Sequence, residues 1–95
     1  MAVTHNTGEL AGSVTAVQMP NVPCSRARFK ARDDNSGNVY IGAAGVTAPD
    51  GTTDTTTGFP LDAGDDSGWI YCSNLNELFR ICDNAGDDLI YWAQS

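Results

Sequence analysis

The stretch SRARFKAR, residues 25–32, alternates basic and small or apolar side chains along its whole length. Successive side chains of a β-strand point to opposite faces, so this spacing would place all the cations on one face and Ala27, Phe29 and Ala31 on the other. The stretch therefore predicts a strand with one basic face. Its basic residues are Arg26, Arg28, Lys30 and Arg32.

Short runs of the same alternating kind recur through the chain, separated by clusters of Gly, Asp, Asn and Thr. This pattern is typical of an all-β domain. The fold that we expect is a small antiparallel β-sandwich or barrel. The expected strands are 13–19, 24–32, 38–43, 68–72, 77–82 and 88–93, with a shorter one at 59–61.

Two connections are predicted to be hairpin turns, because Asp, Asn and Gly suit tight turns. They are DDNSGN at 33–38 and DNAGDD at 83–88. The segment 73–84 is compatible with a helix, but a turn at 73–76 followed by a strand is favoured, since its second half alternates. The expected core residues are Val14, Phe29, Val39, Ile41, Leu61, Ile70, Leu78, Ile81 and Leu89.

The chain of 95 residues is interpreted as a flexible N-terminal arm, 1–10, followed by a single β domain, 11–95. Within that domain, 47–57 is expected to form an extended loop, because it is rich in Thr, Gly and Asp and lacks an apolar anchor. The arm and the loop are predicted to order on contact with other subunits. The alternative is that both are simply disordered.

Neither a membrane span nor a secretion signal is recognisable, so synthesis in a cytoplasm is expected. The odd number of cysteines fits that interpretation, and Cys24, Cys72 and Cys82 are predicted to be free thiols.

Catalytic chemistry is not indicated. His5 is the only histidine, and it lies in the expected arm, where it could not serve as a positioned base. The segment beginning at Asp33 resembles a calcium loop, but Ala44 stands where the closing Glu would be needed. The sequence therefore predicts a protein without enzymatic activity, cofactor, metal or small-molecule substrate.

The basic stripe, defined as Arg26, Arg28, Lys30 and Arg32, needs anionic partners. Like charges spaced along one strand face repel, at a total cost on the order of 2 kcal/mol. Nucleic acid is disfavoured because the chain has a formal net charge of −7. We therefore expect carboxylates of this chain or of a neighbouring subunit to face the stripe, which would make the stripe a protein interface.

Trp92 is the second expected interface element. It directly follows Tyr91 in an expected strand, so the two rings must point to opposite faces of the sheet. One of them is then available at a subunit interface, and Trp92 is predicted to be that residue.

Four short segments resemble those of small virion proteins of tailed bacteriophages, which include head decoration, or cement, proteins. These segments are VYIG at 39–42, GFPLDAG at 58–64, NLNEL at 74–78 and IYW at 90–92. The resemblance implies a β-rich, non-enzymatic subunit that works as a homo-oligomer, often a trimer, on a capsid or tail.

The expected function is therefore that of a capsid decoration subunit, located in the virion and made in the host cytoplasm, with the major capsid protein and further copies of itself as partners. Two alternatives stay open. One is another virion component, such as a head–tail connector, tail or fibre protein. The other is a soluble binding module unrelated to virions.

Overall fold

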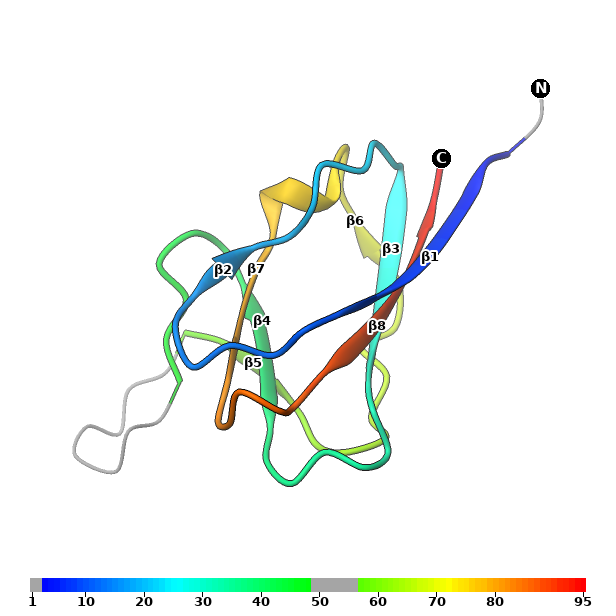
Figure 1. Cartoon of the computed structure of the whole chain (residues 1–95). Helices are drawn as coiled ribbons and strands as arrows, with labels where there is room; N and C mark the ends of the chain where they lie inside the picture. The colour runs from blue at the N-terminus through cyan, green and yellow to red at the C-terminus, as the bar shows by residue number, and fades with distance from the viewer. Residues whose placement is uncertain (1–2, 49–56) are drawn as a thin grey trace.

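The computed structural model describes residues 3–48 and 57–95, which form two four-stranded antiparallel sheets facing each other (Figure 1). Sheet A has the order β1-β8-β3-β6 and sheet B the order β2-β7-β4-β5. The all-β prediction is confirmed. Sheet A consists of β1 (His5–Leu10), β8 (Leu89–Gln94), β3 (Arg26–Ala31) and β6 (Ile70–Tyr71). Sheet B consists of β2 (Val17–Gln18), β7 (Phe79–Cys82), β4 (Val39–Gly42) and β5 (Phe59–Leu61).

The segment after β6 follows the favoured prediction of a turn and then a strand. A single 3₁₀ turn, Leu75–Glu77, comes before β7. Asn74 caps this turn, and the Glu77 carboxylate accepts hydrogen bonds from the backbone N–H groups of Ser73 and Asn74. Within the described residues, no helix is long and apolar enough to cross a membrane.

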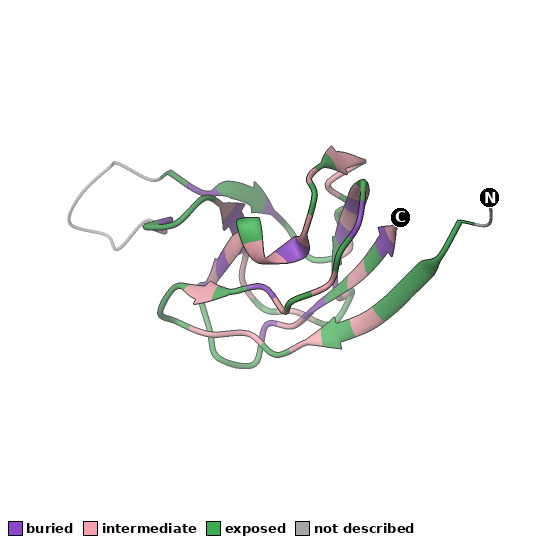
Figure 2. Ribbon diagram, turned by 90° about the horizontal axis from the view of Figure 1, so that it is seen from above, coloured by how far each residue is buried: buried purple, intermediate pink, exposed green. Residues whose placement is uncertain are grey.

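The hydrophobic core lies between the sheets, where buried residues alternate with exposed ones along the longer strands (Figure 2). Most of the predicted core is confirmed. The buried predicted residues are Phe29, Val39, Ile41, Leu61 and Leu89, and Ile70 and Leu78 pack against them while partly buried. Val14 was predicted wrongly, because it lies outside the strands and is 58% exposed.

Strand β7 also departs from the expected core. Arg80 and Cys82 face the interior, so Ile81 lies on the other face of sheet B, opposite Tyr40. The guanidinium of Arg80 can occupy this interior position because its Nε donates a hydrogen bond to the carbonyl of Ala11 at 3.0 Å. Burial lowers the pKa of Arg80. This interior cation ties the segment after β1 to sheet B.

The two predicted hairpins are wrong. Residues 33–38 lead from β3 in sheet A to β4 in sheet B, and 83–88 lead from β7 back to β8. Asp and Gly suit any reversal of the chain, and they do not decide whether the next strand joins the same sheet. Both connections therefore cross from one sheet to the other.

These two crossing connections are joined through the side chain of Asp87, which is 1% exposed. Its carboxylate accepts hydrogen bonds from the backbone N–H groups of Ser36 at 2.9 Å and Gly37 at 3.1 Å, and from the Asn84 amide at 3.0 Å. Burial alone would raise the pKa of Asp87, but these hydrogen bonds together outweigh it and lower the pKa. The buried carboxylate thus holds one end of the sandwich together.

The expected N-terminal arm is instead largely a strand. β1 pairs with β8 over six consecutive residues, and its side chains are mostly exposed. An edge strand of this kind is held by backbone hydrogen bonds, so its sequence, HNTGEL, needs no apolar alternation. Gly8 has a specific role, because a Cβ there would lie 2.8 Å from the Tyr91 ring. Residues 1–2 of the expected arm lie outside the described residues.

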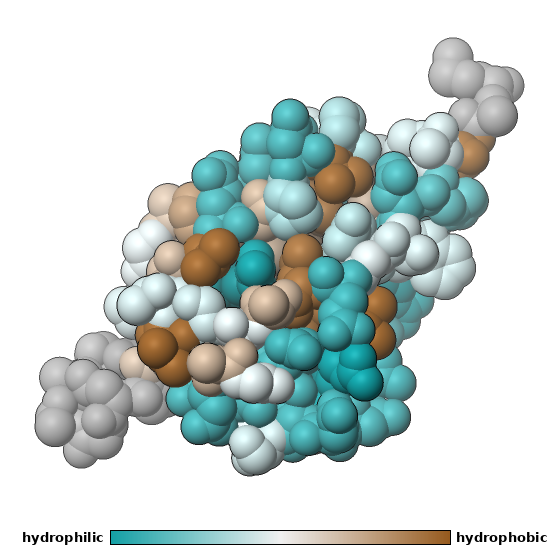
Figure 3. Space-filling model, in the orientation of Figure 1, coloured by the Kyte–Doolittle hydropathy of each residue, from teal (hydrophilic) through white to brown (hydrophobic). Residues whose placement is uncertain are grey.

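Of the predicted loop 47–57, residues 49–56 lie outside the described residues. Its two ends meet: the backbone N–H of Thr47 donates to Thr57 Oγ1 at 3.0 Å, and that of Thr57 donates to Thr47 Oγ1 at 3.1 Å. The face of the molecule viewed in Figure 3 is largely hydrophilic, and its hydrophobic residues form separate small groups.

Candidate functional site: the outer face of sheet A

The basic stripe and Trp92 lie on the same surface, the face of sheet A that points away from sheet B. In the register of β3 with β8, Arg28 lies opposite Trp92, and Lys30 lies opposite Ile90. Directly opposed residues of an antiparallel pair point to the same face. Phe29 and Tyr91, which alternate with them, point inward. The structure therefore brings the predicted interface residues together on one face.

Carboxylates of the same chain engage three of the four stripe residues. Arg28 Nη2 lies 2.8 Å from Asp66 Oδ2, and its Nε also donates to that carboxylate. Lys30 is 3.8 Å from Asp33. Arg32 is bound twice, to Glu9 at 2.6 Å and to Asp34 at 3.2 Å. The anionic partners expected for these three cations are thus present within the chain.

The pKa values of two members of this ion-pair network, Arg32 and Asp66, shift in the directions that the pairing requires. Asp34, by its hydrogen bond, and then Glu9 raise the pKa of Arg32. Partial burial alone would raise the pKa of Asp66, but Arg28 and the backbone N–H of Gly68 together lower it. Arg32 and Asp66 are therefore charged at neutral pH.

Arg26, the fourth stripe residue, is held differently. Its guanidinium carbon lies 4.1 Å from the centre of the Trp69 ring, a cation–π geometry, and its Nε donates to the side chain of Gln94. Arg28 lies over the same ring at 5.3 Å. Trp69 is therefore part of the site, although its position just before β6 gave no indication of this in the sequence.

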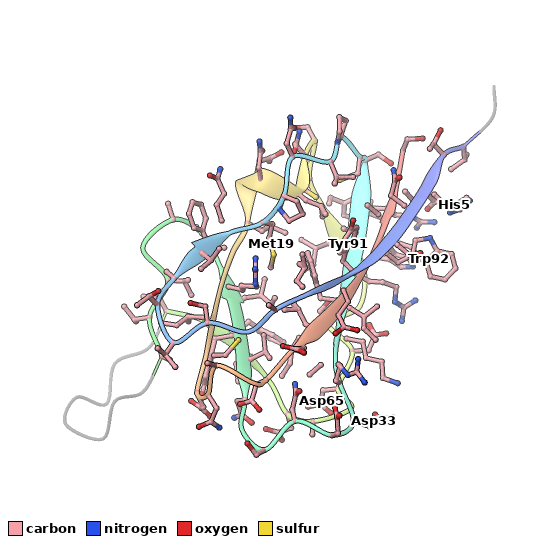
Figure 4. The ribbon with its side chains drawn as sticks, viewed as in Figure 1. His5, Met19, Asp33, Asp65, Tyr91 and Trp92 are labelled. Atoms are coloured by element: carbon pink, nitrogen blue, oxygen red, sulfur yellow. The ribbon has the colours of Figure 1, made fainter. Side chains whose placement is uncertain are left out.

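An aromatic row, defined as His5, Trp92 and Trp69, crosses this face. The ring centres of Trp69 and Trp92 are 6.2 Å apart in an edge-to-face arrangement, and those of Trp92 and His5 are 5.8 Å apart. Trp92 Nε1 also donates a hydrogen bond to His5 Nδ1 at 3.0 Å, and the two side chains lie side by side in Figure 4. His5 was missed as a site residue because β1 was not predicted.

Large apolar side chains remain accessible around this row. Trp92 is 44% exposed, Ile90 40% and Tyr71 81%. Beside Trp92 lies a shallow groove of about 200 Å³. Its lining includes Thr7, Arg28, Lys30, Asp66, Ile90 and Trp92. The face thus combines an apolar centre with charges that are already paired, a composition typical of protein interfaces.

A second groove, of about 360 Å³, lies beside the exposed Phe59 and is also lined by Ile41, Ile70 and Leu78. Among the described residues, its lining includes no charged side chain and no residue of the stripe or of the aromatic row. The outer face of sheet A is therefore the better candidate site.

The cysteines lie apart from this face and are free thiols. Cys24 Sγ and Cys72 Sγ are 3.5 Å apart. Burial, followed by the contact with Cys24, raises the pKa of Cys72 to about 12, and burial also raises the pKa of Cys82. Within residues 3–48 and 57–95, no group of three or more His, Cys, Asp or Glu side chains is placed to hold a metal ion.

Comparisons of the chain with protein-family models, with curated proteins and with solved structures find no match.

Proposed function

We propose that this protein is a non-enzymatic structural subunit of a tailed-phage virion, a head decoration subunit that attaches to the major capsid protein through the outer face of sheet A. The observation that carries the docking surface is the exposure of Trp92, at 44%, in the middle of a face whose cations are already engaged. The virion location rests on the four sequence segments that resemble phage structural proteins.

The paired charges favour a protein partner over nucleic acid. A phosphate backbone would have to displace Asp66 from Arg28 and Glu9 from Arg32, both of which are held at hydrogen-bond distance. The net charge of −7 would add long-range repulsion. A protein surface can instead cover Trp92 while these pairs stay in place at the rim.

The groove beside Trp92 favours the insertion of a single side chain. Its volume of about 200 Å³ is below the roughly 300–1,000 Å³ of small-molecule pockets. Exposed Trp and Arg side chains that flank a small pocket are the residue types most often found at energetic hot spots. We therefore propose an apolar or aromatic anchor from the partner in this groove.

Co-purification tests the role. The chain would be produced with and without the capsid proteins of the phage that encodes it, and particles would then be separated by gradient centrifugation. The proposal expects the chain in the particle fraction, at a copy number comparable with that of the capsid protein. A copy number matching a single ring would assign it to a connector or tail, and absence from particles would overturn the virion role.

A further inference from the structure

The open edge of sheet A has an unusual combination of length and composition. Among the four strands at the sheet edges, β2 and β6 have two residues each and β5 has three, whereas β1 has six. Edge strands normally carry a proline, a lysine or a bulge that prevents pairing with another chain. β5 contains Pro60, but HNTGEL contains neither residue type, and its register with β8 is uninterrupted.

The backbone groups that β1 offers at this edge follow from its pairing with β8. Ser95 N–H donates to the carbonyl of Thr4 at 3.0 Å, so Thr4 directs its backbone groups toward β8. These directions alternate along an antiparallel strand. His5, Thr7 and Glu9 therefore direct their N–H and C=O groups away from β8, toward the open edge.

The other side of β8 provides an independent check of this alternation. The N–H of Ser25 donates to the carbonyl of Gln94 at 2.7 Å, so Gln94 directs its backbone groups toward β3. Gln94 is the residue opposite His5. The backbone groups of His5 are therefore not used by β8.

We infer that this edge pairs with β1 of a second copy of the same chain, antiparallel and centred on Thr7. In that register Thr7 lies opposite its own symmetry mate, and His5 of each copy lies opposite Glu9 of the other. All the N–H and C=O groups that these three residues direct outward would then be paired, which gives a two-fold, self-complementary interface. The two A sheets would join into one eight-stranded sheet.

Charge and hydrogen bonding favour this register over its neighbours. His5 Nδ1 accepts from Trp92, so the imidazole proton lies on Nε2 and is available to a partner. Glu9 binds Arg32 through Oε2, which leaves Oε1 to accept that proton. Shifting the register by one pair would instead set His5 opposite Thr7, or Thr7 opposite Glu9. Only the register centred on Thr7 brings each imidazole to a carboxylate of the other copy.

This inference goes beyond the proposed function and does not depend on a virion role. It is compatible with it, because edge pairing leaves Trp92 and the stripe exposed on a face of doubled width. The two proposals are also separable by experiment, since dimerisation is measured on the isolated chain and attachment on particles.

Sedimentation equilibrium of the full chain, from micromolar to millimolar concentration at physiological salt, tests the pairing. We expect a monomer–dimer equilibrium for the wild type. Thr7→Pro should weaken it at least tenfold, because it removes one outward N–H from each copy and leaves the bonds to β8 in place. Thr7→Val is the matched control and should dimerise like the wild type. A wild type that stays monomeric at millimolar concentration, or Thr7→Pro that dimerises normally, would overturn the inference.

Charge exchange tests the register by a second route, in case Thr7→Pro fails to fold. Glu9→Lys sets Lys opposite His5, and His5→Glu sets Glu opposite Glu9, so each substitution should weaken the dimer by about tenfold. The double variant His5→Glu/Glu9→Lys sets Glu opposite Lys across the edge, in place of the hydrogen bond between His5 and Glu9, and should recover most of the affinity. Failure of the double variant to recover, with circular dichroism like that of the wild type, would contradict the register centred on Thr7.

Discussion

Trp92 donates its indole N–H to Nδ1 of His5 over 3.0 Å, although 87 residues separate them in the chain. The contact joins β8 to β1 on the outer face of sheet A. Trp69 packs edge-to-face against Trp92 and lies under Arg26 and Arg28 of β3, so the aromatic row continues to that strand. The expected N-terminal arm is therefore largely part of the sheet, and it contributes a side chain to the site.

Gly12 tests the packing at the end of the sandwich that Asp87 organises. A Cβ at this position would lie 2.1 Å from the carbonyl oxygen of Asp87, so Gly12→Ala must displace backbone. We expect a loss of about 3 kcal/mol in the free energy of unfolding, measured by urea denaturation. Gly86→Ala is the matched control in the adjoining connection, because no atom of residues 3–48 or 57–95 beyond its chain neighbours lies within 4 Å of its added Cβ. Its effect on the free energy of unfolding should be within about 1 kcal/mol. Equal stabilities of the two variants would show that Gly12 does not pack this closely against Asp87.

Asp87 should control the acid sensitivity of the fold. The pKa of Asp87 is lowered in the folded state, because its hydrogen bonds outweigh the effect of burial. The contribution of this carboxylate to the free energy of unfolding is therefore complete above the pKa of Asp in the unfolded chain, about 3.9. That contribution is lost as the pH falls through the lower folded-state pKa. Asp87→Asn should cost about 2 kcal/mol at pH 7 and should lose less stability than the wild type on acidification below pH 4. Parallel stability–pH curves for the two proteins would contradict this role.

The pair of Arg28 and Asp66 should contribute little to stability, because both side chains are more than one-third exposed. A double-mutant cycle with Arg28→Gln and Asp66→Asn should give a coupling of about 0.2–1 kcal/mol, and the coupling should shrink in 1 M salt. A coupling that is absent at low salt would show that the pair does not form in solution.

The same network predicts weak binding to DNA. Fluorescence anisotropy with the isolated chain at physiological salt should show no affinity in the micromolar range or tighter, because three of the stripe cations are already paired with carboxylates. Micromolar binding that is lost in Arg28→Gln/Lys30→Gln would instead identify the stripe as a nucleic-acid surface.

The cysteines should resist modification in the folded protein. Burial raises the pKa of Cys72 to about 12, so its reactive thiolate is scarce at neutral pH, and Cys24 and Cys82 are buried. Alkylation should therefore be slow in native protein, and it should label three cysteines once the unreduced protein is unfolded, as read by mass spectrometry. A disulfide between Cys24 and Cys72 in protein from a reducing cytoplasm would contradict the prediction.

How much the sequence predicts differs between β3 and β1, two of the three long strands of sheet A that bear the site. β3 was predictable because SRARFKAR alternates regularly, and the core position of Phe29 follows from the same period. β1 was not, because an exposed edge strand is held by its backbone and leaves no apolar pattern. The hairpin prediction failed for a similar reason, since turn residues specify a reversal without specifying the sheet that the next strand joins.

The candidate site shows the same limit. Side-chain alternation alone could predict the basic stripe, and it could place Tyr91 and Trp92 on opposite faces of the sheet. The contacts with Trp69 and His5 could not be predicted in this way, because they depend on which strands are neighbours in the sheet and in which register. The pairing of Arg28 with Asp66 likewise joins positions whose proximity no local pattern reveals.

Binding of purified variants to particles assembled without the chain tests the central claim most directly. Trp92→Ala should weaken attachment about 30-fold, because it removes the exposed ring at the centre of the proposed docking face. Phe59→Ala is the control, since Phe59 is 62% exposed but belongs to sheet B. Our account predicts wild-type attachment for Phe59→Ala and a large loss for Trp92→Ala, with both variants folded by circular dichroism. Wild-type attachment by Trp92→Ala would contradict the assignment of this face as the docking surface.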